Sequence, residues 1–547
     1  MVTLTCAAIV IVAILAHRAG GEVHEREGWL ARALASRGAL GLVFVVTFAT
    51  LWYSWGAVDP VPVVHDEMAY VLQAKIFARG TWTLPSPALP AFWEQPYILL
   101  KPALAAKYFP GHALLLALGA FVGWMPLIPL LLQSAAGCLL YVLARRVSCG
   151  GVAFLAWVVW LFTPMVLYFG PSYYSEATTT VCWLAGWYAL LEWRQSRTLA
   201  WIAVLAAFVG WGAITRPLTG LAYAIPVGVV VMRDVVTAHR WRDLIVAFVV
   251  GALVMSILPV WSAHTTGDWR VTPLSLYTRE YMPYDVPGFG LAATPPAHAL
   301  TPEMARLNDV LMASHVGHTP ASLPGTLVSR AHYLWDSIWG VSSGALGVFA
   351  VLGLLTLTSG SAFAVGSSVW LLLVYLTFAT PAKWTLYYYE SVPAFAFLTA
   401  SGVAWAASLL GRPRGAPSAA SHGWLSHRYT GPLAVGALVL ALPGLAALRL
   451  IHVQHLTDGR VLAQFSALLS SVPGGKSVMF VRYAADHDAH VTFVRNSANA
   501  AQERIWVVYD RGEIENAQFL DHVPDRKAYL FDEAQGRTYS YDPRSVP

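Results

Sequence analysis

Two adjacent carboxylates, Asp66 and Glu67, stand in a polar, Pro-rich stretch of a chain that is otherwise strongly apolar. His65 precedes them, and the segment that follows has helical character, so Tyr70 lies one turn beyond Asp66 on the same face. Near a helix N-terminus, Asp66 could serve as an N-cap, a position that Asp commonly fills. In a cleft, a carboxylate can instead remove a proton from an attacking hydroxyl. The sequence leaves both roles open.

A third carboxylate, Glu94, lies between aromatic residues in the sequence FWEQPY. It could be a rim residue paired with a nearby lysine, or a second acid that binds a sugar hydroxyl. A metal site with His65 or His112 is the less favoured alternative, because one carboxylate and scattered histidines lack a fixed ligand spacing. We therefore predict no cofactor; a divalent metal is left open but is not indicated by the sequence.

Four basic residues fall near the ends of apolar segments, on what we predict to be the outer side of a membrane: Lys101, Lys107, Arg216 and Lys383. Each could simply extend its side chain to the interface. Basic residues are expected to be scarce on the outer side. Four of them therefore also indicate a phosphate-binding role, for which Arg and Lys donors are suited.

The segment Tyr387–Glu390 has the sequence YYYE. It could be an interfacial aromatic belt, since Tyr is enriched where a bilayer meets water. It could equally be a sugar-stacking wall, with Tyr388 beside the hydrogen-bonding carboxylate of Glu390. The sequence does not separate these two roles.

The composition indicates that these residues belong to a membrane protein. Only 12% of the 547 residues are charged and 57% are hydrophobic, whereas a soluble chain carries about 25% charged residues. Repeated apolar runs predict an α-helical polytopic membrane protein with about 11–12 spans. The net charge of +5 is modest, and we find no nucleic-acid-binding motif, so the expected surroundings are membrane lipids.

Apolar spans are predicted at Ala39–Trp55, Met125–Leu143, Val152–Phe169, Thr178–Leu191, Leu199–Ile214, Gly220–Val231, Leu244–Trp261, Ala345–Leu357, Ala362–Ala379, Val392–Leu410 and Pro432–Leu450. The run Thr3–Leu15 could be a weak first span or a consequence of a start codon set too early, and a cleaved signal peptide is the less favoured alternative. Arginines fall in every second connection, so they can all face the cytoplasm: Arg145, Arg146, Arg194, Arg197, Arg233, Arg240, Arg242, Arg412, Arg414 and Arg428.

This orientation requires Gly111–Val122 to be a juxtamembrane or half-crossing helix, since about twelve residues are too few for a full crossing. The first large loop (57–112), the second (263–343) and the C-terminal tail then share the outer side, where a catalytic face is expected. We predict helices at Pro302–Ser314 and Gly325–Trp335 in the second loop.

Two domains are predicted: a transmembrane domain over 1–450 and a small soluble α/β domain over 451–547. The second follows from alternating strands and helices after the last apolar span. The strands are expected at Ser477–Tyr483, Arg504–Tyr509 and Lys527–Phe531, and the helices at Asp458–Leu469 and Ile514–Leu520.

The motifs of the first outer loop resemble a known family. HDEMAYVLQAKIFARGTWT, then FWEQP, then KYFPGHALLLALG are similar to the first periplasmic loop of the GT-C membrane glycosyltransferases. The nearest pattern is that of the protein O-mannosyltransferases, the aminoarabinose transferases and related bacterial proteins. That group typically carries Tyr-Pro-Pro before a Gly, whereas Tyr108 and Pro110 here flank Phe109. Arg216-Pro217 and YYYESVP also resemble the group.

The resemblance implies an inverting glycosyltransferase of the bacterial inner membrane that acts on the cell envelope from the periplasmic side. Its donor would be a polyprenyl-phosphate sugar, and its acceptor a lipid, glycan or protein. By matching position, Asp66 is the general base and Glu67 assists it or binds the sugar. Lys101, Lys107 and Arg216 would hold the phosphate. The other residues expected to contact substrate are His65, Tyr70, Glu94, Tyr108, His112, Lys383, Tyr388 and Glu390.

Two other classes of function remain open. A glycan ligase or polymerase would also use outer loops. A transporter of lipid-linked sugars usually places ionisable or broken-helix features near the bilayer midplane, often in repeated halves, and we find no such repeat. Convergence of Asp66, Glu67 and Arg216 with Lys101 or Lys107 on one outward cavity favours the transferase. A polar path across the membrane favours the transporter.

Overall fold

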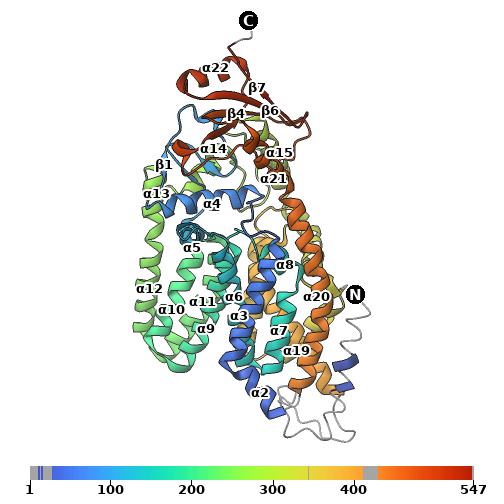
Figure 1. The fold of residues 1–547 in the computed structure, drawn as a ribbon. Helices are drawn as coiled ribbons and strands as arrows, with labels where there is room; N and C mark the ends of the chain where they lie inside the picture. Colours follow the sequence, from blue (N-terminus) through green and yellow to red (C-terminus); the bar gives the residue numbers. More distant parts are fainter. Residues whose placement is uncertain (1–9, 13, 16–26, 343, 411–428, 545–547) are drawn as a thin grey trace, which may run out of the picture.

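The computed structural model describes residues 10–12, 14–15, 27–342, 344–410 and 429–544 of the chain. Long apolar helices form one layer, and short helices with two small sheets gather at one end of them (Figure 1). The predicted run Thr3–Leu15 lies mostly outside the described residues, as do Arg412, Arg414 and most of the connection that carries them.

Six helical segments of the described residues are long and apolar enough to cross a membrane. Three are single helices: Arg37–Trp55 (α3), Leu127–Val147 (α6) and Pro217–Ala238 (α11). Three combine two helices each: Trp241–Thr266 (α12, Trp241–Met255, and α13, Ile257–Thr266), Thr385–Leu409 (η5, Thr385–Ser391, and α19, Val392–Leu410) and Thr430–Ser471 (α20, Thr430–Asp458, and α21, Arg460–Ser471). A pair bent by 112°, Pro320–Ser342 with Ala345–Thr356, would be a seventh. These helices confirm a polytopic α-helical membrane protein. The count of about 11–12 full spans stays a prediction.

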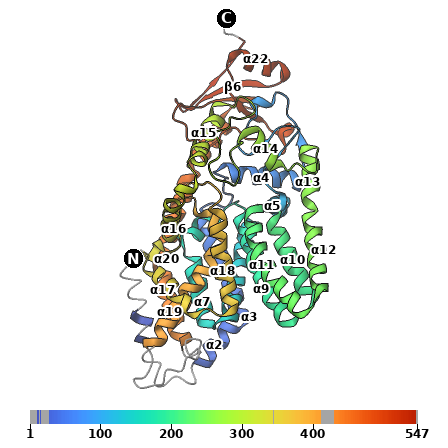
Figure 2. The ribbon, with the colours of Figure 1, turned by 180° about the vertical axis from the view of Figure 1, so that it is seen from behind.

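Shorter helices pack among the long ones (Figure 2). They are Glu27–Ala35 (α2), Pro110–Phe121 (α5), Gly150–Leu161 (α7), Pro164–Phe169 (α8), Leu199–Ala213 (α10), Ala345–Gly353 (α17) and Ser359–Tyr375 (α18), with the longer but more polar Glu176–Ser196 (α9) beside them. α5 has 12 residues and spans about 18 Å. It is the short helix that the positive-inside pattern required.

The segment Val152–Phe169, predicted as one span, is broken between α7 and α8. Pro164 cannot donate a backbone hydrogen bond, so it favours the first position of a new helix. The Thr163 hydroxyl caps that helix by accepting from the Val166 N–H at 3.2 Å. The predicted single span is therefore two shorter helices.

The first outer loop forms a helix and a small sheet over this end. Helix α4 (His65–Ala78) lies across the bundle above α5 (Figure 1). The strands Leu84–Pro85 (β1), Ile98–Leu99 (β2) and Ala103–Ala106 (β3) pair antiparallel in the order β1-β3-β2. The sequence did not predict this sheet, because strands of two to four residues carry too little alternation.

The second outer loop and the C-terminal region complete the layer. The second loop contributes Pro273–Tyr281 (α14), Pro302–Val316 (α15) and Leu323–Trp339 (α16). Beyond α20 and α21, the strands Ser477–Arg482 (β4), Ile505–Tyr509 (β5), Lys527–Asp532 (β6) and Arg537–Ser540 (β7) form a sheet in the order β5-β4-β6-β7, with Glu513–His522 (α22) packed on it. β4 runs parallel to β5 and β6, as a small α/β unit requires.

This C-terminal sheet shares its core with the first outer loop. On one face, Ile76 of α4 belongs to the same buried cluster as Phe480 of β4 and Phe519 of α22. On the other, Met68 of α4 packs with Phe465 of α21 and Phe531 of β6. Because α4 contributes to both clusters, the sheet region holds the helix that carries Asp66.

The close crossing of α17 and α19 in the layer of long helices gives a stability prediction. A Cβ placed on Gly402 of α19 would collide with the Phe349 carbonyl oxygen of α17, whereas one on Gly366 of α18 meets nothing within 4 Å. We expect Gly402→Ala to cost about 1–3 kcal/mol by overpacking and to lower the thermal unfolding midpoint of the purified protein. Gly366→Ala is the control and should leave the midpoint unchanged or slightly higher. Equal midpoints for the two variants would contradict this packing.

Candidate active site

Asp66 is available for chemistry at the N-terminal end of α4. The helix begins at His65 with Val64 as its N-cap, so the N-cap role considered for Asp66 is wrong. Asp66 is half-buried, and the Tyr108 hydroxyl donates a short hydrogen bond to its Oδ1. Oδ2 accepts no hydrogen bond from the described residues. The Tyr108 ring stacks on the Tyr70 ring with 4.6 Å between centroids, and this stacking holds the Tyr108 hydroxyl against the Asp66 carboxylate.

Glu67 and His112 hold the loop in place. Glu67 is buried, and its two oxygens each accept a backbone N–H at 3.0 Å, from Val63 and Tyr173. Burial raises the pKa of Glu67 above its ordinary value. His112 Nε2 donates to the Tyr173 carbonyl at 2.9 Å, while Nδ1 accepts from the Thr178 hydroxyl at 2.8 Å. These contacts favour positioning roles for both residues.

Lys107 provides a buried cation beside Asp66. Only 4% of the residue is exposed, and lysine is rarely so buried unless paired. Its Nζ lies 3.5 Å from Asp285 Oδ2 and 3.8, 5.3 and 5.1 Å from the ring centroids of Tyr97, Tyr108 and Tyr277. Tyrosine faces attract an ammonium group, so the three rings and Asp285 together surround Lys107 Nζ at a site shielded from water.

The groups around Lys107 shift one another's pKa values. Burial, and then the Asp66 and Asp285 carboxylates, raise the pKa of Tyr97 well above its ordinary value. Burial alone would raise the pKa of Asp285, but Lys107 and His315 together hold it below its ordinary value. His315 Nε2 lies 3.4 Å from Asp285 Oδ1. The phenol stays neutral, and the carboxylate stays charged.

Arg216 supplies a second cation on the membrane side of the cluster. Its guanidinium forms an ion pair with Glu176, donates to the Tyr375 hydroxyl at 3.3 Å and lies 5.3 Å from the centroid of the Tyr387 ring. The charges of Asp66 and Asp285 also act on the Tyr387 hydroxyl. Tyr387 therefore connects the Arg216 side of the cluster with the Asp66 side.

Other predicted site residues lie outside this cluster. Lys101 is exposed at the turn between β2 and β3, and Lys107 follows the far end of β3. The four strand residues between them span roughly 13 Å, so the two lysines face different surroundings. Lys383 is exposed too, and no contact among the described residues joins it to Asp66.

Three further residues have structural partners. Glu94 is buried and accepts from the Thr301 N–H at 3.1 Å, with His298 Nε2 at 3.4 Å. This excludes the proposed rim pairing with lysine and explains Glu94 as a link between the two outer loops. Tyr388 accepts from Arg330 at 3.0 Å. Glu390 is buried, accepts from the Thr179 hydroxyl and leaves Oε2 without a partner among the described residues.

Tyr387 belongs to the aromatic segment whose role the sequence left open. The sequence missed four other members of the cluster: Tyr97, Glu176, Tyr277 and Asp285. None stands in a motif with a fixed spacing. The one available signal was for Glu176, an acid directly before a long apolar run, where a charge needs a partner. Within the described part of the chain, no group of three or more His, Cys, Asp or Glu is placed to hold a metal ion.

Comparison with known proteins supports the architecture. Neither a protein-family model nor a curated protein matches the chain. ArnT from Cupriavidus metallidurans, solved with bound undecaprenyl phosphate, is 14% identical with a TM-score of 0.52, over 91% of this chain and 94% of that one. The Archaeoglobus fulgidus oligosaccharyltransferase is 11% identical with a TM-score of 0.47, over 91% and 70%. Arabinosyltransferase EmbB from Mycobacterium smegmatis is 14% identical with a TM-score of 0.45, over 86% and 44%.

The match to ArnT over nearly all of both chains shows a shared fold. The chain is a multi-pass membrane protein with the GT-C fold. The predicted fold class and the resemblance to GT-C membrane glycosyltransferases are thereby confirmed at the level of architecture.

His65, next to Asp66, gives a pH prediction. Its buried ring donates to the Ala489 carbonyl at 2.7 Å, and burial lowers its pKa to about 4. Between pH 6.5 and 4 the His65 ring is protonated in the unfolded chain but stays neutral in the folded chain. The contribution of His65 to the free energy of unfolding is therefore fully present above pH 6.5. It is lost as the pH falls from 6.5 to 4, which lowers the free energy of unfolding by about 3 kcal/mol in total.

We expect His65→Gln to flatten the pH dependence of unfolding across this window, measured by denaturation of the purified protein at a series of pH values. His332→Gln changes a histidine whose side chain is 70% exposed, and this control should retain the slope of the unchanged protein. A His65→Gln protein with an unaltered slope would contradict the buried neutral histidine.

Proposed function

We propose that the chain is an integral membrane glycosyltransferase that moves a sugar from a polyprenyl-phosphate donor to an acceptor hydroxyl. The observation that carries this proposal is that the half-buried Asp66 carboxylate and the shielded Lys107 ammonium group both contact Tyr108, while the Arg216 guanidinium lies against Tyr387 at the same end of the apolar helices. The fold shared with ArnT, whose structure holds undecaprenyl phosphate, supports a lipid-linked donor.

In this mechanism Asp66 is the general base. Tyr108 holds Oδ1, which leaves Oδ2 to accept the proton of the acceptor hydroxyl. As that proton moves to Asp66, the hydroxyl oxygen bonds to the anomeric carbon, and the bond from that carbon to the phosphate oxygen breaks. Attack from the face opposite the phosphate inverts the anomeric centre. The products are the glycosylated acceptor and polyprenyl phosphate.

Lys107 and Arg216 stabilise the phosphate as it leaves. Charge builds on the leaving oxygen in the transition state, and fixed cations in a water-poor site act strongly on it. Each cation is already oriented by a carboxylate, Lys107 by Asp285 and Arg216 by Glu176, so little reorganisation is needed on donor binding. The Tyr97 and Tyr387 rings would form the wall around the sugar.

The proposed orientation places this layer on the periplasmic side of a bacterial inner membrane. The polyprenyl chain would lie among the apolar helices, with its phosphate at their outer ends. Residues 451–547 would then form an extracytoplasmic domain that packs on α4. This orientation is supported by the arginines, which lie in every second loop between predicted spans, because loops rich in arginine face the cytoplasm.

Replacing the base tests the chemical step. We expect Asp66→Asn to lower the transfer rate by about 10²–10⁴-fold, the usual contribution of a general base, while binding of undecaprenyl phosphate persists. The assay would follow sugar transfer from a panel of polyprenyl-phosphate sugars. Asp309→Asn removes an exposed carboxylate of α15 and should keep full activity. An Asp66→Asn enzyme as active as this control would refute the assignment.

The two lysines of the first loop form a matched pair for the phosphate site. We expect Lys107→Gln to weaken undecaprenyl phosphate binding by roughly 10–100-fold, as for loss of a charge-assisted contact. Lys101→Gln should bind as the unchanged protein does. Because Lys107→Gln removes the lysine partner of Asp285 and leaves this carboxylate only His315, the double variant with Asp285→Asn separates lost binding from a damaged fold. Equal losses for Lys101 and Lys107 would contradict the proposed site.

A further inference from the structure

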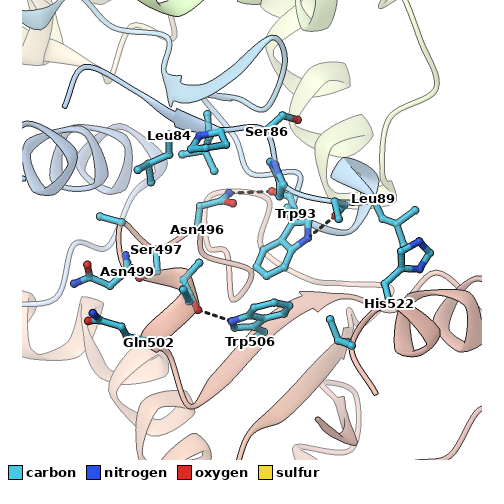
Figure 3. A pocket seen from close by; sticks show the side chains of 18 of the residues that line it. Leu84, Ser86, Leu89, Trp93, Asn496, Ser497, Asn499, Gln502, Trp506 and His522 are labelled. Carbon is cyan, nitrogen blue, oxygen red and sulfur yellow. Dashed lines mark hydrogen bonds between the residues drawn. The ribbon is translucent and has the colours of Figure 1, made fainter. Parts of the chain in front are cut away.

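A separate cavity of about 530 Å³ lies between the first outer loop and the C-terminal sheet region. One side is built by 84–93, from β1 to Trp93, and the other by the 496–502 loop with Trp506 of β5 and α22 (Figure 3). Arg79 at the end of α4 also lines it. From Asp66 to Arg79 the helix rises about 20 Å, so the Arg79 side of the cavity is far from Asp66, whereas Leu104 of β3 lines the side nearer to Lys107.

The inner wall of the cavity is apolar and aromatic. The Trp93 and Trp506 rings meet edge to face with their centroids 5.3 Å apart, and Phe519 lies 6.2 Å from Trp93. Both indole N–H groups are already used, since Trp93 donates to Ala88 at 3.2 Å and Trp506 to Ala500 at 2.7 Å. These rings can therefore offer a ligand apolar contact but no indole hydrogen bond.

Polar groups without partners surround this wall. The Gln502 amide, the Asn499 amide nitrogen and His522 Nε2 make no hydrogen bond to the described residues, and Gln502 and His522 lie on opposite sides of the two indoles (Figure 3). Arg79 donates to the Asn499 side-chain oxygen and supplies a positive charge. None of the lining residues is acidic.

We infer that this cavity binds a saccharide unit, neutral or anionic, at a distance from the reacting centre. A sugar ring presents C–H groups on its faces and hydroxyls at its edges, which matches an aromatic wall ringed by free amides. A volume of about 530 Å³ is within the range of small-molecule sites, roughly 300–1,000 Å³. A hydrocarbon chain would make no use of the exposed amides around the aromatic wall, and a cationic ligand would meet Arg79 with no compensating carboxylate.

The inference deepens the proposed function, on which its biological meaning rests: the saccharide would be a distal part of a glycan acceptor. Contacts far from the reacting bond can be used to orient the substrate. A separation of about 20 Å along α4 requires an acceptor of several sugar units rather than a single one. The cavity thereby selects a glycan among the lipid, glycan and protein acceptors left open above.

The test is binding of the purified full-length chain, without donor, to an array of neutral and uronic-acid-containing oligosaccharides and to matched aromatic and proline-rich peptides. We expect saccharide binding that weakens roughly tenfold or more in Gln502→Ala and in Trp506→Leu. The controls remove the same residue types from exposed positions elsewhere, Gln464→Ala and Trp269→Leu, and should bind normally.

Gln502 is exposed, so its variant should fold even if the Trp506 variant does not. Binding of no saccharide, binding of peptides alone, or saccharide binding that survives Gln502→Ala and a folded Trp506→Leu would each overturn the inference. Asp66→Asn should still bind the saccharide. That result separates this site from the proposed chemistry: binding that persists in a protein without transferase activity would reject the function and keep the site.

Discussion

The buried ammonium group of Lys107 must be paired, because an isolated charge shielded from water costs several kcal/mol. Asp285 and three tyrosine rings meet that requirement. Lys107 belongs to the first outer loop and Asp285 to the second, so the pairing fixes one loop against the other. One of the same rings, Tyr108, donates to Asp66. The cation and the proposed base are therefore positioned by shared residues.

The surrounding lipid explains why these charges collect in one layer. A bilayer core has no water to satisfy polar groups, so irregular backbone and ionised side chains are favoured only at its edge or inside the protein. Arg216 follows this rule at the end of α10, where Glu176 neutralises it. The C-terminal sheet covers the same layer from outside and shares both of its cores with α4. Chemistry that must exclude water and still receive a lipid-linked substrate fits this arrangement.

The sequence predicted most of the helices, because a long apolar run can be recognised without knowledge of the tertiary structure. It also pointed to Asp66 as the proposed base, because that residue stands in a dense local motif. It could not distinguish Lys101 from Lys107, since the short strand between them has no sequence signature. Glu94 was ambiguous because its partner, Thr301, is 207 residues away. Asp285 and Tyr277 were missed for the same reason: only tertiary packing brings them to Lys107. The break at Pro164 was visible as a proline but was masked by the apolar residues around it.

The most direct test of the account is an experimental structure of the full chain with undecaprenyl phosphate bound. The account predicts the phosphate between Lys107 Nζ and the Arg216 guanidinium, with the Asp66 carboxylate facing the side from which an acceptor would approach. A phosphate held instead by the exposed Lys101 or Lys383, with the Lys107–Asp285 and Arg216–Glu176 pairs undisturbed and distant from it, would contradict the assignment of this cluster as the donor site.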